Sequence, residues 1–430
     1  MTSFGVAGEG GYYPRRMIVS SRLYLAVALC LTASGCSGGA ADPAADKDAK
    51  VDAATKGDEA KGAAGPLGIQ PKGDANGAGG GHGEHGGHGA APERDTTPVK
   101  QGISDAKELI REGEGHFGAL QQLTFGGENA EAYYSFAEDK LILQSTREGR
   151  ECDQIYSLDL KDGATKMLSS GEGRTTCAYY LPGDTKIVYA STHAADPGCL
   201  PPPDRSHGYV WKIYDEFDIY VADADGGNPQ VLSASPGYDA EATVSPKGDR
   251  IVFTSTRDGD PEIYTMAIDG SDVKRLTTTP GYDGGPFFSP DGSKIIYRAN
   301  HPEGEEETAK YREILDKGLV RPTRLELFVM DADGQNQRQI TKNGKANFAP
   351  FFHPDGERVI FASNMNDEKG RNFDLYMIGL DGEGLEQITH EDTFDGFPMF
   401  SRDGKHLVFA SNRGGAKHGD TNVFRAEWKD

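Results

Sequence analysis

Acidic and basic side chains recur at matching positions of this 430-residue sequence. Acidic or amide side chains stand six residues before the Ser or His of successive turns, and basic or amide side chains follow the next apolar run. The first set is Asp239, Asp283, Asn347 and Asp395, and the second is Arg147, His193, Arg257, Arg298, Asn364 and Arg413. Such groups either form ion pairs, an acid of one repeat holding a base of the next, or line a polar funnel for a peptide terminus, a glycan or a cation. Glu241 would add a charge to the rim of that funnel.

Histidines suggest a second chemistry, which is metal binding. His82, His85 and His88 have three-residue spacing in GHGEHGGHG, and imidazoles in a mobile tract can chelate Zn²⁺, Ni²⁺ or Cu²⁺. An unselective solvated linker has the same composition. His193 and His301 follow two different apolar runs at comparable places and are weak candidates for a separate site. We predict no cofactor, with a divalent metal at these imidazoles as the alternative.

Cysteine pairing is a third constraint. Cys152, Cys177 and Cys199 lie in the part of the chain that we expect to fold. One disulfide and one remaining thiol is the simplest arrangement in an exported protein. The sequence leaves all three pairings open.

The first 36 residues have the features of an export signal. Arg15, Arg16 and Arg22 precede the apolar run LYLAVALCL at residues 23–31, and small residues lead to Cys36 in LTASGC. This pattern resembles the lipobox of a bacterial lipoprotein signal peptide, in which the cysteine becomes the acylated first residue. We therefore expect a lipid anchor at Cys36, in the outer membrane facing the periplasm rather than at the cell surface. A simple secretory signal is the alternative.

Residues 37–100 have no aromatic side chain and are rich in Ala, Gly and Asp. This composition cannot bury enough apolar area to offset chain entropy, so it predicts a disordered tether before a folded domain at residues 101–430. The whole chain has 67 acidic and 45 basic side chains and a net charge of −22. Such a surface repels nucleic acid, which excludes a nucleic-acid partner, and we expect a monomer.

The elements that position these residues follow from a repeat. A turn rich in Pro, Asp and Gly, followed by an apolar run, recurs six times. The copies are residues 135–145, 180–191, 244–255, 288–299, 352–363 and 400–411. Hairpin signals with Asp-Gly follow several copies, so each repeat predicts four antiparallel strands, A to D. The second strand is apolar throughout, which indicates that both of its faces are covered. We therefore predict an all-β protein, a six-bladed β-propeller.

The ends of the repeat array predict how the ring closes. The sixth repeat has no fourth strand after Asn422–Trp428, whereas ALQQLT at residues 119–124 resembles a fourth strand with no strands A to C before it. We expect these two segments to pair, which removes an exposed sheet edge.

The loops predict a binding face. In a propeller strand A lies beside the axis, so the D–A and B–C loops form one face, here named the loop face, and the A–B and C–D turns form the other, the turn face. The A–B and C–D turns are short and stereotyped, which is typical of a structural face. Two long B–C insertions, residues 192–217 and 301–324, lie on the loop face, and the second predicts a helix near Glu305–Lys317. We expect the ligand there.

The stretches SPDGSKIIYRA, VMDADGQNQRQIT and HPDGERVIFASN resemble the six-bladed propeller of the TolB family and related WD-repeat-like propellers. The resemblance implies a non-enzymatic scaffold that docks an envelope protein or peptide, or a glycan, on the loop face. The same repeats resemble the propeller of oligogalacturonate lyases, which hold a metal with channel-mouth histidines. A metal-dependent polysaccharide lyase is therefore the alternative function.

Overall fold

The computed structural model describes residues 98–430. The predicted signal peptide with Cys36, and the predicted tether with its three histidines up to residue 97, lie outside the described residues. Within residues 98–430, no helix is both long and apolar enough to cross a membrane.

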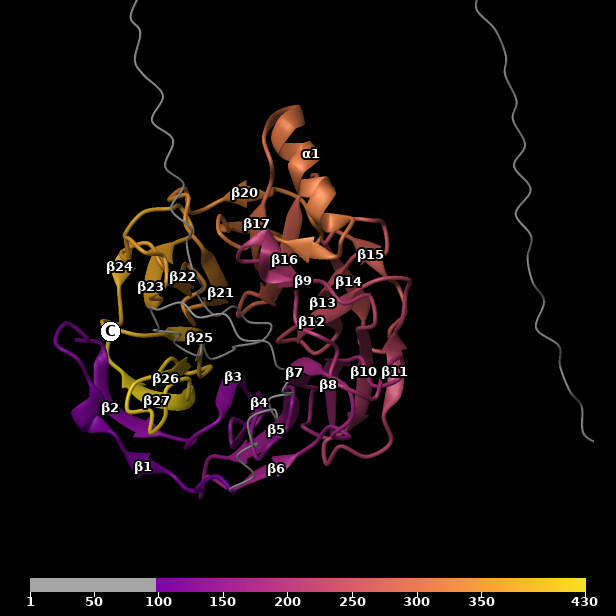
Figure 1. The fold of residues 1–430 in the computed structure, drawn as a ribbon. Coiled ribbons are helices and arrows are strands. Elements are labelled where there is room, and N and C mark those ends of the chain that lie inside the picture. The colour runs from indigo at the N-terminus through magenta and orange to yellow at the C-terminus, as the bar shows by residue number, and fades with distance from the viewer. Residues whose placement is uncertain (1–97) are drawn as a thin grey trace, which may run out of the picture. The chain divides into compact units, whose positions relative to one another are not determined.

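Six four-stranded antiparallel blades surround a central axis, which confirms the predicted fold (Figure 1). The first three blades, each from the axis outward, are β3 (Glu128–Tyr134), β4 (Lys140–Thr146), β5 (Gln154–Asp159), β6 (Thr165–Met167); β7 (Thr175–Tyr180), β8 (Lys186–Ser191), β10 (Asp218–Asp223), β11 (Gln230–Ser233); and β12 (Asp239–Val244), β13 (Arg250–Ser255), β14 (Glu262–Ala267), β15 (Lys274–Arg275). The other three are β16 (Tyr282–Phe288), β17 (Lys294–Asn300), β19 (Glu326–Asp331), β20 (Arg338–Gln339); β21 (Asn347–Phe352), β22 (Arg358–Ser363), β23 (Asp374–Gly379), β24 (Glu386–Gln387); and β25 (Asp395–Phe400), β26 (His406–Ser411), β27 (Asn422–Trp428), β2 (Phe117–Gln122).

The core lies between neighbouring blades. In the second strand of each blade the apolar run is buried on both faces, and in β13 the side chains of Ile251, Val252 and Phe253 are all 0% exposed. Adjacent sheets cover each other in this way only around a ring, because each sheet needs a neighbour on both sides. The continuous apolar runs of the sequence are therefore explained by burial between blades.

The turns between the first and second strands have one design. In the fourth blade the Asp291 carboxylate accepts hydrogen bonds from the Ser289 hydroxyl (2.7 Å) and the Ser293 backbone N–H (2.9 Å). These bonds lower the pKa of Asp291 to about 2. Gly292 follows with φ 68°, a left-handed conformation that glycine adopts at little cost. The Ser-Pro-Asp-Gly signal thus specifies a rigid turn.

The ring closes as predicted. β2 pairs antiparallel with β27, with Leu120 opposite Ala426 and Gln121 opposite Arg425. The structure adds a feature that the sequence did not predict: β1 (Ser104–Asp105) pairs with β2 and makes this the only five-stranded sheet among the described residues. Strands from both ends of the described chain therefore lie side by side (Figure 1).

A buried ion pair stabilises this closure. Both Nη atoms of Arg413 donate to the carboxylate of Glu114, at 3.0 and 2.9 Å, and Nη2 also donates to Asp395 at 2.8 Å. The side chains of Arg413 and Glu114 are 0% exposed. Glu114 precedes β2, whereas Arg413 belongs to the loop after β26, so the pair joins the two ends of the described chain.

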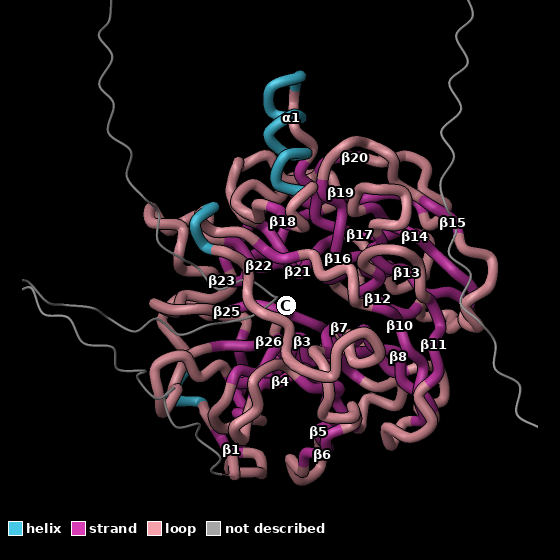
Figure 2. The backbone as a smooth tube through the Cα atoms, turned by 45° about the vertical axis from the view of Figure 1, so that its right-hand side comes forward, coloured by secondary structure: helices cyan, strands magenta, loops and turns pink. Residues whose placement is uncertain are grey.

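The two insertions meet above the third blade. β9 (Trp211–Lys212) in the first insertion pairs with β18 (Leu319–Val320) in the second. The predicted helix is α1 (Gly304–Leu315), which projects from the ring (Figure 2). Its Ile314 is buried, and Tyr311 and Leu315 pack against the cluster beneath them, so the apolar side of the helix packs on the propeller. A disulfide joins Cys152 to Cys199, and Cys177 is a buried free thiol.

The closing ion pair can be tested by substitution. Glu114→Ala leaves the buried Arg413 guanidinium with a single carboxylate, and breaking a buried pair in this way costs about 3–5 kcal/mol. We expect urea denaturation to show a loss of stability of that order. Glu112→Ala, an exposed acid in the same segment, is the matched control and should change stability by less than about 0.5 kcal/mol. Equal stability of the two variants would show that the closure of the ring does not depend on this pair.

Candidate functional site

The axis of the ring is lined by one residue per blade at a shared irregularity. Every innermost strand has a β-bulge at its centre, where the register with the second strand shifts. The bulged residues, here named the bulge ring, are Glu131, Cys177, Glu241, Gly285, Ala349 and Phe397, with φ between 50° and 59°. A left-handed conformation is unfavourable for residues other than glycine, so its recurrence in all six blades is imposed by the fold.

The polar part of the bulge ring contains a buried ion pair between two blades. Arg298 of β17 donates through Nη2 to the Glu241 carboxylate of β12 and to the Tyr282 hydroxyl at 2.9 Å. Glu241 also accepts from the Thr254 hydroxyl (2.7 Å) and the Gly285 backbone N–H (2.8 Å). Burial alone would lower the pKa of Arg298, but the Glu241 carboxylate beside it raises that pKa. The pair ties the third blade to the fourth.

Glu131 and Cys177 are the other polar members of the bulge ring. They are 6% and 8% exposed, and a side-chain hydrogen bond joins them. Burial, with a smaller contribution from the charge of Glu241, raises the pKa of Glu131 to about 7. Burial also raises the pKa of the Cys177 thiol well above its usual value, so this thiol is not activated as a nucleophile.

The three aspartates of the predicted set form pairs inside their own blades, so the expectation that an aspartate of one blade holds an arginine of the next is wrong for them. Glu241 and Arg298 are the exception, because they join the third blade to the fourth. Each pair within a blade joins the start of an innermost strand to the loop after the second strand of the same blade, because these two ends lie at the same sheet edge. The pairs are Asp239 with Arg257 (3.0 Å), Asp395 with Arg413 (2.8 Å), Asp283 with His301 (2.9 Å) and Asn129 with Arg147. Asp239, Asp283 and Asp395 are 0% exposed.

The remaining predicted residues occupy other places. Asn347 donates to the Leu325 carbonyl at 2.8 Å, and Asn364 holds the Ala346 backbone N–H at 3.0 Å. His193 bonds the Ser191 hydroxyl at 2.7 Å, and its ring lies 4.5 Å from that of Tyr220.

The sequence analysis grouped Arg298 with Arg257. In the fourth blade, however, His301 occupies the position that corresponds to Arg257, and Arg298 lies three residues before it. His193 and His301 belong to separate blades. Within residues 98–430, no group of three His, Cys, Asp or Glu side chains could hold a metal ion.

The insertions cover the channel at the loop face. Trp211 and Phe217 are 3% and 0% exposed and pack with Tyr238, just before β12, and with Tyr282 of β16. The Trp211 ring lies 5.3 Å from the guanidinium carbon of Arg298. The aromatic side chains of the first insertion therefore form a local core, and that core lies over the bulge ring.

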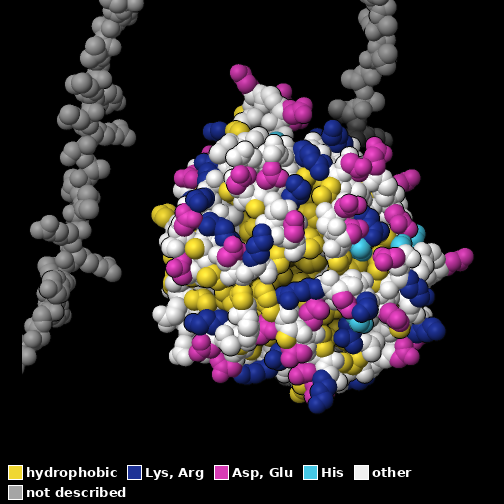
Figure 3. All heavy atoms as spheres, turned by 180° about the vertical axis from the view of Figure 1, so that it is seen from behind, with side chains coloured by type: hydrophobic (Ala, Val, Ile, Leu, Met, Phe, Trp, Pro, Cys, Tyr) yellow, Lys and Arg dark blue, Asp and Glu magenta, His cyan; other side chains and the backbone are white. Residues whose placement is uncertain are grey.

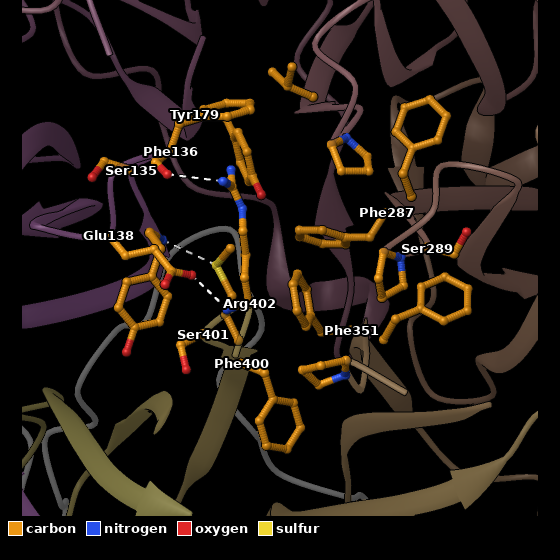
Figure 4. A pocket seen from close by; sticks show the side chains of 18 residues that line it. Ser135, Phe136, Glu138, Tyr179, Phe287, Ser289, Phe351, Phe400, Ser401 and Arg402 are labelled. Atoms are coloured by element: carbon orange, nitrogen blue, oxygen red, sulfur yellow. Dashed lines mark hydrogen bonds between the residues drawn. The ribbon is translucent and has the colours of Figure 1, made fainter. Parts of the chain in front are cut away.

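A cavity opens at the opposite end of the axis, on the turn face. Its volume is about 210 Å³. The lining residues come from the ends of innermost strands and from A–B turns: Tyr134, Ser135, Phe136, Glu138, Tyr179, Val244, Pro246, Phe287, Phe288, Ser289, Pro290, Phe351, Phe352, Pro354, Met399, Phe400, Ser401 and Arg402 (Figure 4). Seen from the side opposite to Figure 1, hydrophobic side chains gather at the centre of the face and charged side chains surround them (Figure 3).

Aromatic contacts close the inner end of the cavity. The Tyr133 ring centroid lies 5.7 Å from that of Tyr179 and 5.4 Å from that of Phe287, which lies 5.4 Å from that of Phe351. Tyr133 is two residues from Glu131, so this aromatic layer separates the cavity from the polar bulge ring. The cavity is therefore blind-ended, apolar and open to one face.

Sequence reasoning missed this cavity because it treated the turn face as structural. A signal was present: pairs of large apolar residues precede the turns in PFFSP, PFFHP and PMFSR. In an ordinary strand one member of each pair would face the core and the other the neighbouring sheet. At the end of an innermost strand the axial neighbour is absent, and both members of each pair line the cavity.

The fold and this site define a class: a closed six-bladed β-propeller with an apolar cavity on its axis. The model of the family described as TolB beta propeller domain matches residues 207–317 and 321–427, just over half of the chain. The chain therefore belongs to the TolB β-propeller family. A search of curated proteins gave no match.

Solved structures with a similar fold include two of this kind and one enzyme. A candidate TolB from Agrobacterium tumefaciens is 16% identical, with TM-score 0.49, covering 78% of this chain and 100% of that chain. TolB from Acinetobacter baumannii is 18% identical, with TM-score 0.45, covering 71% and 65%. Oligogalacturonate lyase from Vibrio parahaemolyticus is 12% identical, with TM-score 0.46, covering 77% and 98%. The family assignment rests on the family model alone.

Titration of the bulge ring gives a prediction for stability. The pKa of Glu131 rises from 4.5 to about 7 on folding. At a pH between these two values, the Glu131 carboxyl is therefore protonated in the folded chain and ionised in the unfolded chain. Stability therefore falls as pH rises through this window. Relative to the natural chain, Glu131→Gln should gain up to about 3 kcal/mol between pH 4.5 and 7 and then level off.

Urea denaturation at several pH values measures this gain. Glu357→Gln, which removes an exposed acid on an A–B turn, is the control and should show a constant difference from the natural chain. A pH-independent difference for Glu131→Gln would mean that Glu131 ionises normally in the folded protein.

Proposed function

We propose that this chain is a non-enzymatic binding module of the cell envelope that docks a protein or peptide partner at the axial cavity of the turn face. The observation that carries the proposal is the cavity itself. Large apolar side chains such as Phe287 and Phe351 line an open hollow in a domain that is otherwise strongly acidic. An exposed apolar hollow rimmed by polar residues is typical of an interaction site.

The size and composition of the cavity support a side chain as its occupant. Small-molecule sites usually measure about 300–1,000 Å³, and this cavity is smaller, at about 210 Å³. It would admit one or two side chains of a partner, while the rest of that partner lies on the surrounding turns. Its lining is apolar and aromatic, which suits a protein segment better than a sugar with many hydroxyl groups.

This placement differs from the expected loop-face site. On the loop face the candidate residues Asp239, Asp283 and Asp395 are buried in pairs, and insertion aromatics cover the axis. In our proposal these residues hold the blades in shape. Membership of the TolB propeller family supports a binding role, and it leaves the partner to be found by experiment.

Photo-crosslinking tests which face binds. A benzoylphenylalanine at Phe351, on the cavity wall, should form a covalent adduct with a partner in intact cells. The same group at the exposed Lys342 of a D–A loop, or at Val231, which is 55% exposed on an outer strand, should form none. Adducts are detected by immunoblot and identified by mass spectrometry. Adducts from Lys342 with none from Phe351 would place the partner on the loop face and refute the proposal.

We also propose that Cys36 tethers the module to a membrane. Without the acylated cysteine no lipid chain is attached, so Cys36→Ala should move the protein from the membrane fraction to the soluble periplasmic fraction. Cys30→Ala, which changes a cysteine within the apolar run, is the control and should leave the protein in the membrane fraction. Fractionation followed by immunoblotting measures both. A Cys36→Ala protein that stays membrane-bound after a salt wash would refute the anchor.

A further inference from the structure

The rim of the cavity departs from the repeat in two adjacent blades. The rim is defined here as the second residue of each A–B turn, and its members are Phe136, Pro182, Pro246, Pro290, Pro354 and Arg402. Four of the six are proline. The two exceptions, Phe136 and Arg402, belong to the first and sixth blades, which are neighbours across the seam. One side of the cavity mouth is therefore chemically distinct from the rest.

The turn itself does not require arginine at position 402. In the sixth blade the Ser401 hydroxyl donates to Asp403 at 2.8 Å, and the Gly404 N–H donates to the Ser401 carbonyl at 2.9 Å. The fourth blade has the same bonds with Pro290 in that place, at 2.7 and 2.8 Å. Because the internal bonds of the turn form equally well with proline, the turn itself does not explain the arginine side chain.

Arg402 is held beside the cavity by its neighbour Phe136. Its Nη1 donates to the Phe136 carbonyl at 3.0 Å, and its guanidinium carbon lies 4.8 Å from the centre of the Phe136 ring. The Glu138 carboxylate accepts the backbone N–H of Arg402 at 2.6 Å. Figure 4 shows the Arg402 side chain lying along the cavity wall, opposite Phe287 and Phe351. The guanidinium is thus fixed in place before any ligand arrives.

The Arg402 guanidinium has more N–H donors than the described structure uses. Arginine has five N–H donors, and in the described structure only the Nη1 bond to Phe136 involves the Arg402 side chain. Arg402 is the one cation among the lining residues of this cavity. A ligand that fills the apolar hollow and presents a carboxylate at its mouth would satisfy both the aromatic wall and the unused donors.

We propose that the cavity takes the C-terminal residue of a partner chain, with an apolar or aromatic side chain in the hollow and the α-carboxylate on Arg402. This inference rests on the proposed function and names the chemistry of the partner. The Tyr133–Phe287 contact bounds the inner end of the hollow, so a side chain enters it from the mouth. The volume of about 210 Å³ matches one large side chain rather than a longer segment. A carboxylate at the rim complements Arg402, the single cation of the lining, whereas the Glu138 carboxylate in the same lining is engaged by the Arg402 backbone N–H.

Fluorescence anisotropy with defined peptide pools tests this assignment. The probes are fluorescein-labelled hexapeptides with five randomised positions and a final Phe or Leu, made as the free acid and as the C-terminal amide. The folded domain should bind the acid pool about tenfold more tightly than the amide pool, since a bond to a charged group is worth at least that factor. Added salt should weaken only the acid pool.

Variants assign the preference to Arg402. Arg402→Gln keeps the backbone N–H to Glu138 and should bind both pools equally, at the affinity of the amide pool. Arg402→Pro, which restores the residue of the other turns, also removes the backbone N–H that Glu138 accepts, and it should show no preference for the acid pool. Lys405→Gln removes an exposed charge from the same turn and should keep the tenfold preference. Circular dichroism confirms that each variant is folded.

Several outcomes would overturn the inference. These are equal binding of the acid and amide pools, no binding of either, or a preference that persists in Arg402→Gln. An amidated pool with an internal Phe-Asp pair that binds as tightly as the free acid would assign the site to a side-chain carboxylate instead. Each of these results can coexist with a crosslink from Phe351, so the inference can fail while the proposed function stands.

Discussion

The seam between the first and last blades is the constraint on which the rest of the molecule depends. In an open array of blades, the outer face of each terminal sheet would lack its neighbour. β2 supplies the missing strand of the last blade, and Arg413 lies between Asp395 of that blade and Glu114 from the segment before β2. Arg413 and Glu114 are buried and come from opposite ends of the described chain, so they meet only when the ring is closed. The axial channel exists because this seam holds.

A closed ring turns one strand of every blade toward the same axis, and the bulges decide what those strands present there. At the level of the bulge ring, the first three blades place Glu131, Cys177 and Glu241, whereas the other three place small or apolar side chains. Trp211 covers this level from the loop face and Tyr133 separates it from the cavity. Exclusion of water from both ends explains why the pKa of Glu131 rises to about 7.

The sequence predicted what depends on local chemistry. The six blades, the closing strand at residues 119–124 and the helix after His301 follow from turn residues and apolar periodicity, which act over a few positions. The pairing expected for the aspartates was wrong because each lies opposite the end of the second strand of its own blade, a neighbour set by strand register and not by local sequence. Arg298 resembled a member of that set because it is basic and near the end of an apolar run. The two-residue strands β9 and β18 are about a hundred residues apart and carry no pattern that would predict their pairing.

The loop face and the turn face differ in what varies between the repeats. Length variation on the loop face usually marks a binding surface. Here the insertions bury their aromatic side chains against each other and over the bulge ring, so the added residues cover the axis. On the turn face the length is constant and the residue type varies. A turn fixed by its own Ser-Asp-Gly hydrogen bonds holds any side chain at its second position in a defined place. Arg402 stands where four other turns have proline, and it adds a charge to the cavity mouth beside Phe136. Because this side chain is already held in place, it loses little conformational entropy when a ligand binds, which is the condition for selective recognition.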